Sequence, residues 1–328
     1  MKLFFVQIKI FCRVLINYKK MCKRKNIFFF FYIFPPLGFV LYNFFLKPFV
    51  LNKNKKIINK YLKYKIFKIC LRFFSIDERY RVSKILYEYN DLNNFRIDET
   101  SKLKVEELEN NGFCSVGKFF SDKECCDFQN FLEGKSCYTN QVPLQSNGKS
   151  CLFSLKKFNQ DNSTFPYIVF LPEIIEYKPI QKFLLDPQIQ NIINSYLKFE
   201  WTIYSCITWF NPKSETKHYV HRFHRDHDDY KSLTMFIYWT DVDEETGCFN
   251  YIKYSHKNDV NDNNIINLTG KRGEVFFADT SGLHCASQIK KNYRYITQIR
   301  FGKPDGYSAV VDGFCQSPTQ KELSFLIN

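Results

Sequence analysis

Alanine is nearly absent from this chain. Only three of its 328 residues are alanine: Ala278, Ala286 and Ala309. Phe, Tyr, Ile, Asn and Lys are abundant instead, which is the bias expected of an AT-rich genome. The composition therefore reflects coding bias as well as folding. The length suits one catalytic domain with extensions, or at most two domains.

Acidic residues are missing from the first part of the chain. Residues 1–72 contain 17 of the 47 Lys and Arg residues and no Asp or Glu, so the remaining chain has 30 basic and 33 acidic residues, a net charge of −3. Nucleic-acid binding depends on clustered basic contacts to phosphate, and a nearly neutral core gives it little electrostatic support. We therefore predict no nucleic-acid partner for this part of the chain.

Paired cysteine motifs are also missing. The chain has twelve cysteines, but they are scattered and none forms a Cys-x-x-Cys pair. Disulfide frameworks belong mostly to short secreted chains, so this pattern favours reduced thiols and a cytoplasmic location.

An uncharged, Phe-rich run covers residues 26–46 and is long enough to cross about 30 Å of hydrocarbon as a helix. Pro35 and Pro36 would break a simple helix in its middle. Basic residues on both flanks favour contact with an anionic surface, and no small-residue cleavage site follows, which argues against a removable signal. Three interpretations stay open: peripheral membrane contact through residues 1–56, a spurious extension, and a soluble packing segment.

We predict four segments. Residues 1–50 form the basic, Phe-rich N-terminal segment, residues 51–110 a helical region, residues 111–306 the catalytic domain, and residues 307–328 a C-terminal tail. Periodicity and helix-end signals predict helices over residues 55–73, 76–89, 102–110, 121–132 and 181–197. Ser121 and Glu124 form a capping-box pattern, and Asn111-Gly112 is a stop signal. Strands are predicted over residues 201–209, 233–240, 248–254, 273–278 and 293–301. The predicted fold is mainly β, an antiparallel jelly roll with flanking helices.

The triplet His224-Arg225-Asp226 carries the chemistry. On an extended strand, alternate side chains share a face, so His224 and Asp226 project together and Arg225 points away. A nitrogen from His284 on another strand would complete a site of two histidines and one carboxylate, which leaves positions on Fe(II) open for a bidentate cosubstrate and dioxygen.

Five of the six histidines lie before residue 257, so the ligands have to be chosen among them. His221, His224 and His227 are spaced by three, which on a helix would suggest a zinc site. The acidic and aromatic neighbourhood favours a strand that ends in a loop, and therefore the pair His224 and Asp226. We expect His256 to have a structural or substrate-side role.

Two arginines can anchor the carboxylate of a cosubstrate. Arg294 and Arg300 lie at even separation on one predicted strand and share a face. A guanidinium binds a carboxylate through two parallel hydrogen bonds. The spacing from His284 favours Arg294, and Arg300 is expected to pair with an acid.

The region from Asn111 to Gly306 resembles the phytanoyl-CoA dioxygenase-like family of Fe(II)/2-oxoglutarate-dependent oxygenases. The resemblance lies in an ordered series of motifs: Phe223–Asp229, Phe236–Gly247, Tyr254–Lys257, Gly273–Asp279, His284 and Arg294. It implies a double-stranded β-helix (jelly-roll, cupin-like) core, iron held by His224, Asp226 and His284, and 2-oxoglutarate held by Arg294, with dioxygen as the oxidant.

The chain departs from the family pattern at one position. Family members often have a small hydroxyl residue two positions after the last histidine, where this chain has Ala286, and Ser287 is the nearest substitute. Halogenases of the family lack the carboxylate ligand, whereas Asp226 is present here. The resemblance therefore implies hydroxylation rather than halogenation.

The leading hypothesis is a dioxygenase that hydroxylates a small-molecule, lipid or glycan-linked substrate. The basic, apolar N-terminal segment is the only hint toward a lipid or membrane-linked glycan. Two alternatives are a noncatalytic metal-binding jelly-roll accessory protein and a zinc or manganese enzyme on a similar barrel. The sequence leaves the substrate and the oligomeric state open.

Overall fold

The computed structural model describes residues 75–76, 79, 97–139, 149–154, 156, 167–170, 174–199, 201–214, 219–258, 260 and 264–302. The segment 1–50, the tail 307–328 and nearly all of the helices predicted over 55–73 and 76–89 lie outside them. Contacts divide the chain into two units, Met1–Phe74 and Ser75–Asn328. This division falls inside the helical region predicted over residues 51–110, and all the predicted domain boundaries stay predictions.

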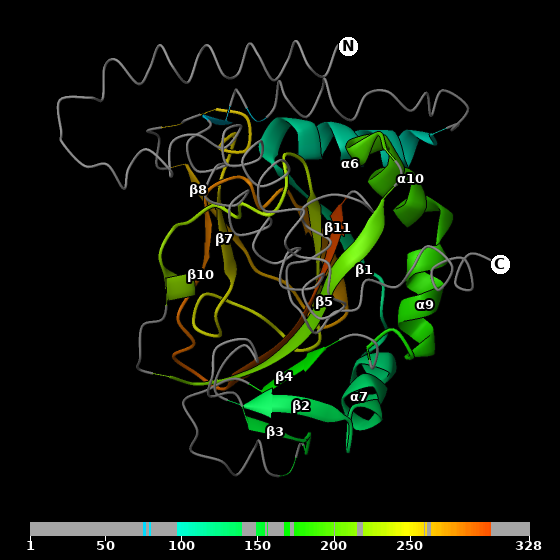
Figure 1. Ribbon diagram of the computed structural model, residues 1–328, viewed down its shortest axis with the longest axis vertical. Coiled ribbons are helices and arrows are strands. Elements are labelled where there is room, and N and C mark those ends of the chain that lie inside the picture. The colour runs from blue at the N-terminus through cyan, green and yellow to red at the C-terminus, as the bar shows by residue number, and fades with distance from the viewer. Residues whose placement is uncertain are drawn as a thin grey trace, which may run out of the picture. The chain divides into compact units, whose positions relative to one another are not determined.

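Two antiparallel sheets form the second unit (Figure 1). The large sheet has the order β1-β9-β6-β11-β5-β4-β2-β3, and the small sheet has the order β10-β7-β8. The strands of the large sheet are β1 (Phe113–Lys118), β2 (Ser136–Thr139), β3 (Lys149–Leu152), β4 (Tyr167–Phe170), β5 (Thr202–Pro212), β6 (Leu233–Tyr238), β9 (Glu274–Ala278) and β11 (Tyr293–Gly302). Those of the small sheet are β7 (Phe249–Ile252), β8 (Ile265–Leu268) and β10 (His284–Ala286). The predicted mainly β, jelly-roll fold is confirmed.

The central strands of the large sheet are buried on both faces. Along β11, Tyr295 and Ile299 belong to the core that includes the helices, whereas Ile296 packs in a second cluster with Phe249 and Tyr251 of β7. This alternation follows from the two-residue period of a strand. The second cluster therefore marks the space between the two sheets, where even-numbered side chains of β11 point.

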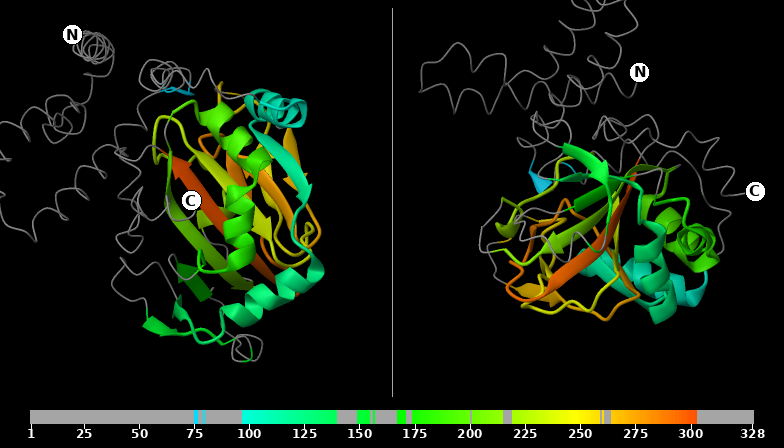
Figure 2. Two further views of the ribbon diagram at one scale, coloured as in Figure 1. Left: turned by 90° about the vertical axis from the view of Figure 1, so that its right-hand side faces the viewer. Right: turned by 90° about the horizontal axis from the view of Figure 1, so that it is seen from below.

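The helices cover the other face of the large sheet, as the two views of Figure 2 show. They are α6 (Glu99–Asn111), α7 (Asp122–Phe131), α9 (Lys178–Leu185) and α10 (Pro187–Leu197), and a 3-10 turn, η3 (Tyr219–His221), precedes the histidine triplet. Within the described part of the chain, no helix combines the length and the apolar character that a membrane crossing requires.

Two helix ends follow the sequence signals, and one prediction is wrong. Ser121 and Glu124 form the predicted capping box at the start of α7, and Gly112 ends α6 in the left-handed region with φ of 89°. The single helix predicted over residues 181–197 is two helices, because Pro187 restricts Asp186 to an extended conformation. Asp186 then caps α10 by accepting from the backbone N–H of Gln188 and Ile189.

Candidate metal centre

The triplet His224-Arg225-Asp226 lies beside the start of β10. His224 and His284 exchange two backbone hydrogen bonds, of 2.9 and 3.0 Å, and the Asp226 N–H donates to the carbonyl of Thr280 at 2.8 Å. The segment is extended at His224 but is not a regular strand. Pairing with the segment Thr280–His284 therefore fixes both proposed ligands of the triplet relative to His284.

The structure brings together the three side chains that the sequence selected. His224, Asp226 and His284 each offer a ligand atom, and these atoms lie within 4.8 Å of one another. His284 Nε2 is 4.0 Å from Asp226 Oδ2. Arg225 points away, as expected, and donates to the carbonyl groups of Ser255 and Ser281.

Hydrogen bonds at Nδ1 leave Nε2 of each neutral histidine ring available to a metal. Nδ1 of His224 lies 2.8 Å from the carbonyl oxygen of Arg222, and Nδ1 of His284 lies 2.9 Å from that of Gly282. A carbonyl oxygen only accepts, so each Nδ1 carries the proton and each Nε2 has a lone pair available. Burial also lowers the pKa of His284 to about 4, which keeps its ring neutral at physiological pH. The donor set fits a divalent transition metal such as Fe(II).

Arg294 is a buried cation without a carboxylate partner among the described residues. It is 9% exposed, and none of the described acids forms an ion pair with it. Its guanidinium donates to the carbonyl of Gly247 and to Asn211 Oδ1 at 3.3 Å, whereas its Nε has no hydrogen-bond partner in the part of the chain that the structure describes. Burial lowers its pKa, which reflects the cost of an uncompensated charge. A bound carboxylate would offset that cost.

Gly247 allows the close approach of Arg294. Its φ is 92°, and a Cβ there would lie 2.6 Å from Ile289 Cγ1 and 3.4 Å from Arg294 Nη1. A side chain at this position would therefore displace Ile289 and crowd the guanidinium of Arg294.

Arg300 differs from Arg294 because described acids surround it. Its Nη1 is 2.5 Å from Asp228 Oδ2, and its Nη2 is 3.2 Å from Asp226 Oδ2. The expectation that Arg300 pairs with an acid is met, but one of the acids is a proposed metal ligand. Sequence reasoning missed that connection, although Asp226 and Asp228 are two residues apart in an extended segment and so tend to face one side.

Among the described residues, neither His256 nor Ser287 joins the triad. His256 is 5% exposed, and its Nε2 lies 3.1 Å from the carbonyl oxygen of Glu109, which is a structural contact. Ser287 Oγ accepts from Asn250 Nδ2 at 2.9 Å and contacts the thiol of Cys248. Ser287 therefore contacts neither His284 nor Arg294 through its hydroxyl. His218 lies outside the described residues.

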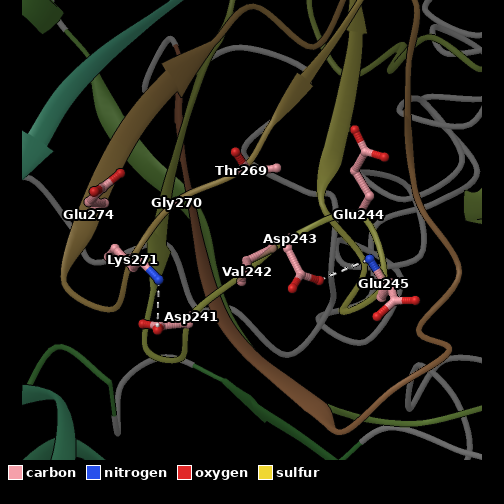
Figure 3. A pocket seen from close by; sticks show the side chains of 9 residues that line it. All are labelled: Asp241, Val242, Asp243, Glu244, Glu245, Thr269, Gly270, Lys271 and Glu274. Carbon is pink, nitrogen blue, oxygen red and sulfur yellow. Dashed lines mark hydrogen bonds and ion pairs between the residues drawn. The ribbon is translucent and has the colours of Figure 1, made fainter.

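The acidic run that follows β6 forms a turn. Figure 3 shows the pocket that it lines together with Thr269, Lys271 and Glu274. The carboxylate of Asp243 accepts from the backbone N–H of Glu245 and Thr246, and that of Asp241 accepts from Lys271. These contacts explain the acids as turn and surface residues.

A jelly roll with two histidines and one carboxylate between its sheets defines a class of metal-dependent oxygenases. The family model described as phytanoyl-CoA dioxygenase matches residues 108–290, slightly more than half of the chain. The chain therefore belongs to the phytanoyl-CoA dioxygenase family, whose enzymes depend on iron and 2-oxoglutarate. The predicted metal and cosubstrate agree with this family and with the triad. No curated protein matches the sequence.

Several solved structures are similar to this chain. The α-ketoglutarate-dependent epimerase SnoN from nogalamycin biosynthesis is 12% identical, with 63% of this chain and 84% of that chain covered and a TM-score of 0.43. AviO1 from Streptomyces viridochromogenes Tue57 is 12% identical, with coverage of 65% and 98% and a TM-score of 0.42. HygX from Streptomyces hygroscopicus, solved with nickel and 2-oxoglutarate, is 13% identical, with coverage of 62% and 86% and a TM-score of 0.44. These likenesses do not identify the reaction or the substrate of this chain.

Proposed function

We propose that this protein is an Fe(II)/2-oxoglutarate-dependent dioxygenase that hydroxylates a small-molecule, lipid or glycan-linked substrate. His224, Asp226 and His284 would hold the iron, and Arg294 would hold the far carboxylate of 2-oxoglutarate. When bound, iron and 2-oxoglutarate supply the oxidising chemistry: 2-oxoglutarate and dioxygen become succinate and CO2 while one oxygen atom enters a C–H bond of the substrate.

The main support for this proposal is the buried charge of Arg294, which no described acid compensates. Its guanidinium is buried, has no ion pair with a described acid, and keeps one N–H without a partner. Removing a cation from water costs several kcal/mol unless an anion compensates it. A noncatalytic jelly roll that only bound a metal would not need this arrangement, so the buried cation favours the enzyme over the accessory protein.

The protein's own residues would bind and orient the reagents. The carbonyl groups of Arg222 and Gly282 fix the two imidazole rings, and Gly247 and Asn211 fix the plane of the Arg294 guanidinium. Asp226 supplies the carboxylate ligand, which supports hydroxylation rather than halogenation. Phe249 stacks against the His284 ring, with centroids 5.2 Å apart, and shields that side of the site from water.

The first test uses the Arg294→Met variant. Methionine fills similar space without a charge, so we expect the variant to keep its thermal midpoint and to lose about 1.5 to 3 kcal/mol of 2-oxoglutarate binding. Binding is measured anaerobically in the presence of Fe(II), through the visible charge-transfer band that 2-oxoglutarate induces. Arg272→Met is the matched control, because Arg272 is 44% exposed and lies 3.7 Å from Asp241.

Wild-type protein should show the band and release succinate when oxygen is admitted. A metabolite extract should then yield a product one oxygen atom heavier that forms only with 2-oxoglutarate. Metal binding without the band and without succinate would overturn the proposal and favour the accessory protein.

A further inference from the structure

Arg300 occupies the interior face of β11 near the end of the strand. It pairs with Thr234 of β6 and with Ser205 of β5. It follows Arg294 by six residues, so both side chains leave the same face, and their backbones are about 20 Å apart along the strand. The two arginines therefore serve different parts of the space between the sheets.

Three side chains orient the Arg300 guanidinium. Nη1 donates to Asp228 Oδ2 at 2.5 Å, and Nη2 lies 3.2 Å from Asp226 Oδ2. With its amide oxygen facing the guanidinium, Gln298 accepts from Nη2 at 3.1 Å and from Nε at 3.3 Å. All three guanidinium nitrogens are used, which leaves the planar group a single orientation.

The charges explain why the arginine is needed in this place. The Asp228 side chain is 1% exposed, and a carboxylate that is buried to this degree requires a compensating cation. Arg300 supplies it and extends to Asp226, whose side chain is 15% exposed. Asp226 therefore has Arg300 on one side and His284 Nε2, at 4.0 Å, on another.

We infer that Arg300 is a positioning residue for the metal ligand Asp226, anchored by the buried carboxylate of Asp228 and by the amide of Gln298. The inference rests on the proposed function, because it takes Asp226 to bind the metal. Contacts that orient a ligand side chain strengthen metal binding, since less conformational freedom is lost when the metal enters. In the competing explanation, Arg300 only neutralises Asp228 for folding and does not affect the metal.

Arg300→Lys separates the two explanations. Lysine keeps the positive charge beside Asp228 but lacks the planar fork, so it cannot hold Asp226, Asp228 and Gln298 together. Cobalt(II), an oxygen-stable substitute for Fe(II), is titrated into the metal-free full chain and followed by calorimetry and visible absorption. We expect the Kd for cobalt to rise by roughly 10-fold or more and the visible spectrum to change.

Two further variants complete the design. Arg272→Lys alters an arginine in a surface ion pair with Asp241 and should leave the Kd and the spectrum unchanged. Gln298→Met keeps both carboxylates and removes only the amide contact to Arg300. It should change the Kd in the same direction as Arg300→Lys by a smaller factor, and it decides the question alone if Arg300→Lys does not fold.

The outcomes separate this inference from the proposed function. If wild-type protein does not bind one cobalt ion, or if His284→Ala binds it equally well, the proposed metal site fails. If wild-type protein binds cobalt through the triad, but folded Arg300→Lys and Gln298→Met both keep its Kd and spectrum, the positioning role of Arg300 is overturned and the metal site stands.

Discussion

At the scale of single residues, His256 is a buried imidazole that the fold keeps neutral. It is 5% exposed, and burial lowers its pKa below the ordinary value of 6.5. Its Nε2 donates to the carbonyl of Glu109 at the end of α6, and a Cβ on Gly112 would lie 2.7 Å from its Nδ1. His256 therefore joins the loop after β7 to α6, where a charged ring is disfavoured.

We predict a pH dependence of stability that belongs to His256. Because its folded-state pKa lies below its unfolded value, its contribution to stability is present above about pH 6.5 and is lost as the pH falls toward the folded-state pKa. As the pH falls below about 6.5, the free energy of unfolding of the metal-free wild type should decrease by up to about 1.4 kcal/mol per pH unit more than that of His256→Gln. Urea denaturation at several pH values measures the two slopes.

Equal slopes for wild type and His256→Gln would show that the histidine is not held neutral in the folded protein.

At the scale of elements, the turn before β9 joins three parts of the fold. The Gly273 N–H donates to the carbonyl of Tyr238 in β6 at 2.7 Å, and its carbonyl accepts from the N–H groups of Phe119 and Phe120 ahead of α7. Its φ is 85°, and a Cβ there would lie 1.9 Å from the Phe120 carbonyl oxygen. The turn therefore requires glycine for both its conformation and its close contact.

Replacement of two glycines separates these requirements. Gly117 has a φ of 91° and open space around its Cβ position, so Gly117→Ala should cost only the strain of the left-handed region, about 1 kcal/mol. Gly273→Ala should cost about 1 to 3 kcal/mol more, because backbone atoms have to move. Denaturation midpoints measure both, and equal losses would contradict the proposed contact with Phe120.

At the scale of the whole molecule, charge is unevenly distributed. Residues 1–72 contain 17 basic residues and no acidic residue, and the rest of the chain is nearly neutral. Both core clusters and the candidate metal centre lie in the unit Ser75–Asn328. The N-terminal charge is therefore separate in sequence from the residues that would perform the chemistry.

We predict that the full chain binds vesicles containing anionic lipids and that a chain of residues 75–328 does not. Each Lys or Arg near such a surface contributes about 1 kcal/mol at low salt, so binding should weaken as salt is added. Cosedimentation measures binding, and cobalt titration checks that the shorter chain keeps the metal site. Equal sedimentation of both chains, or of neither, would contradict membrane contact through residues 1–56.

Signals within a few neighbouring residues were sufficient to predict some elements. The capping box at Ser121 and the stop at Gly112 formed as predicted, because their hydrogen bonds join residues three or four positions apart. The five strands predicted with bounds correspond to β5, β6, β7, β9 and β11. The strands β1–β4 and β8 were not predicted, and β10 was expected only as a strand without bounds that carries His284. Most of these strands are only three or four residues long, which is too short for an alternation of apolar and polar residues to be detected. Pairing with a neighbouring strand decides whether they form.

The sequence by itself determined the jelly-roll class, the basic character of residues 1–72, and the candidate set His224, Asp226, His284 and Arg294. Only the tertiary structure decided that the first three converge, since their approach depends on backbone pairing between His224 and His284, sixty residues apart. It also decided which side chains lie against each of the two arginines. Partners far apart in the sequence decide whether a buried charge is compensated. Among the described residues, Arg294 has no acidic partner, whereas Arg300 lies against Asp226 and Asp228.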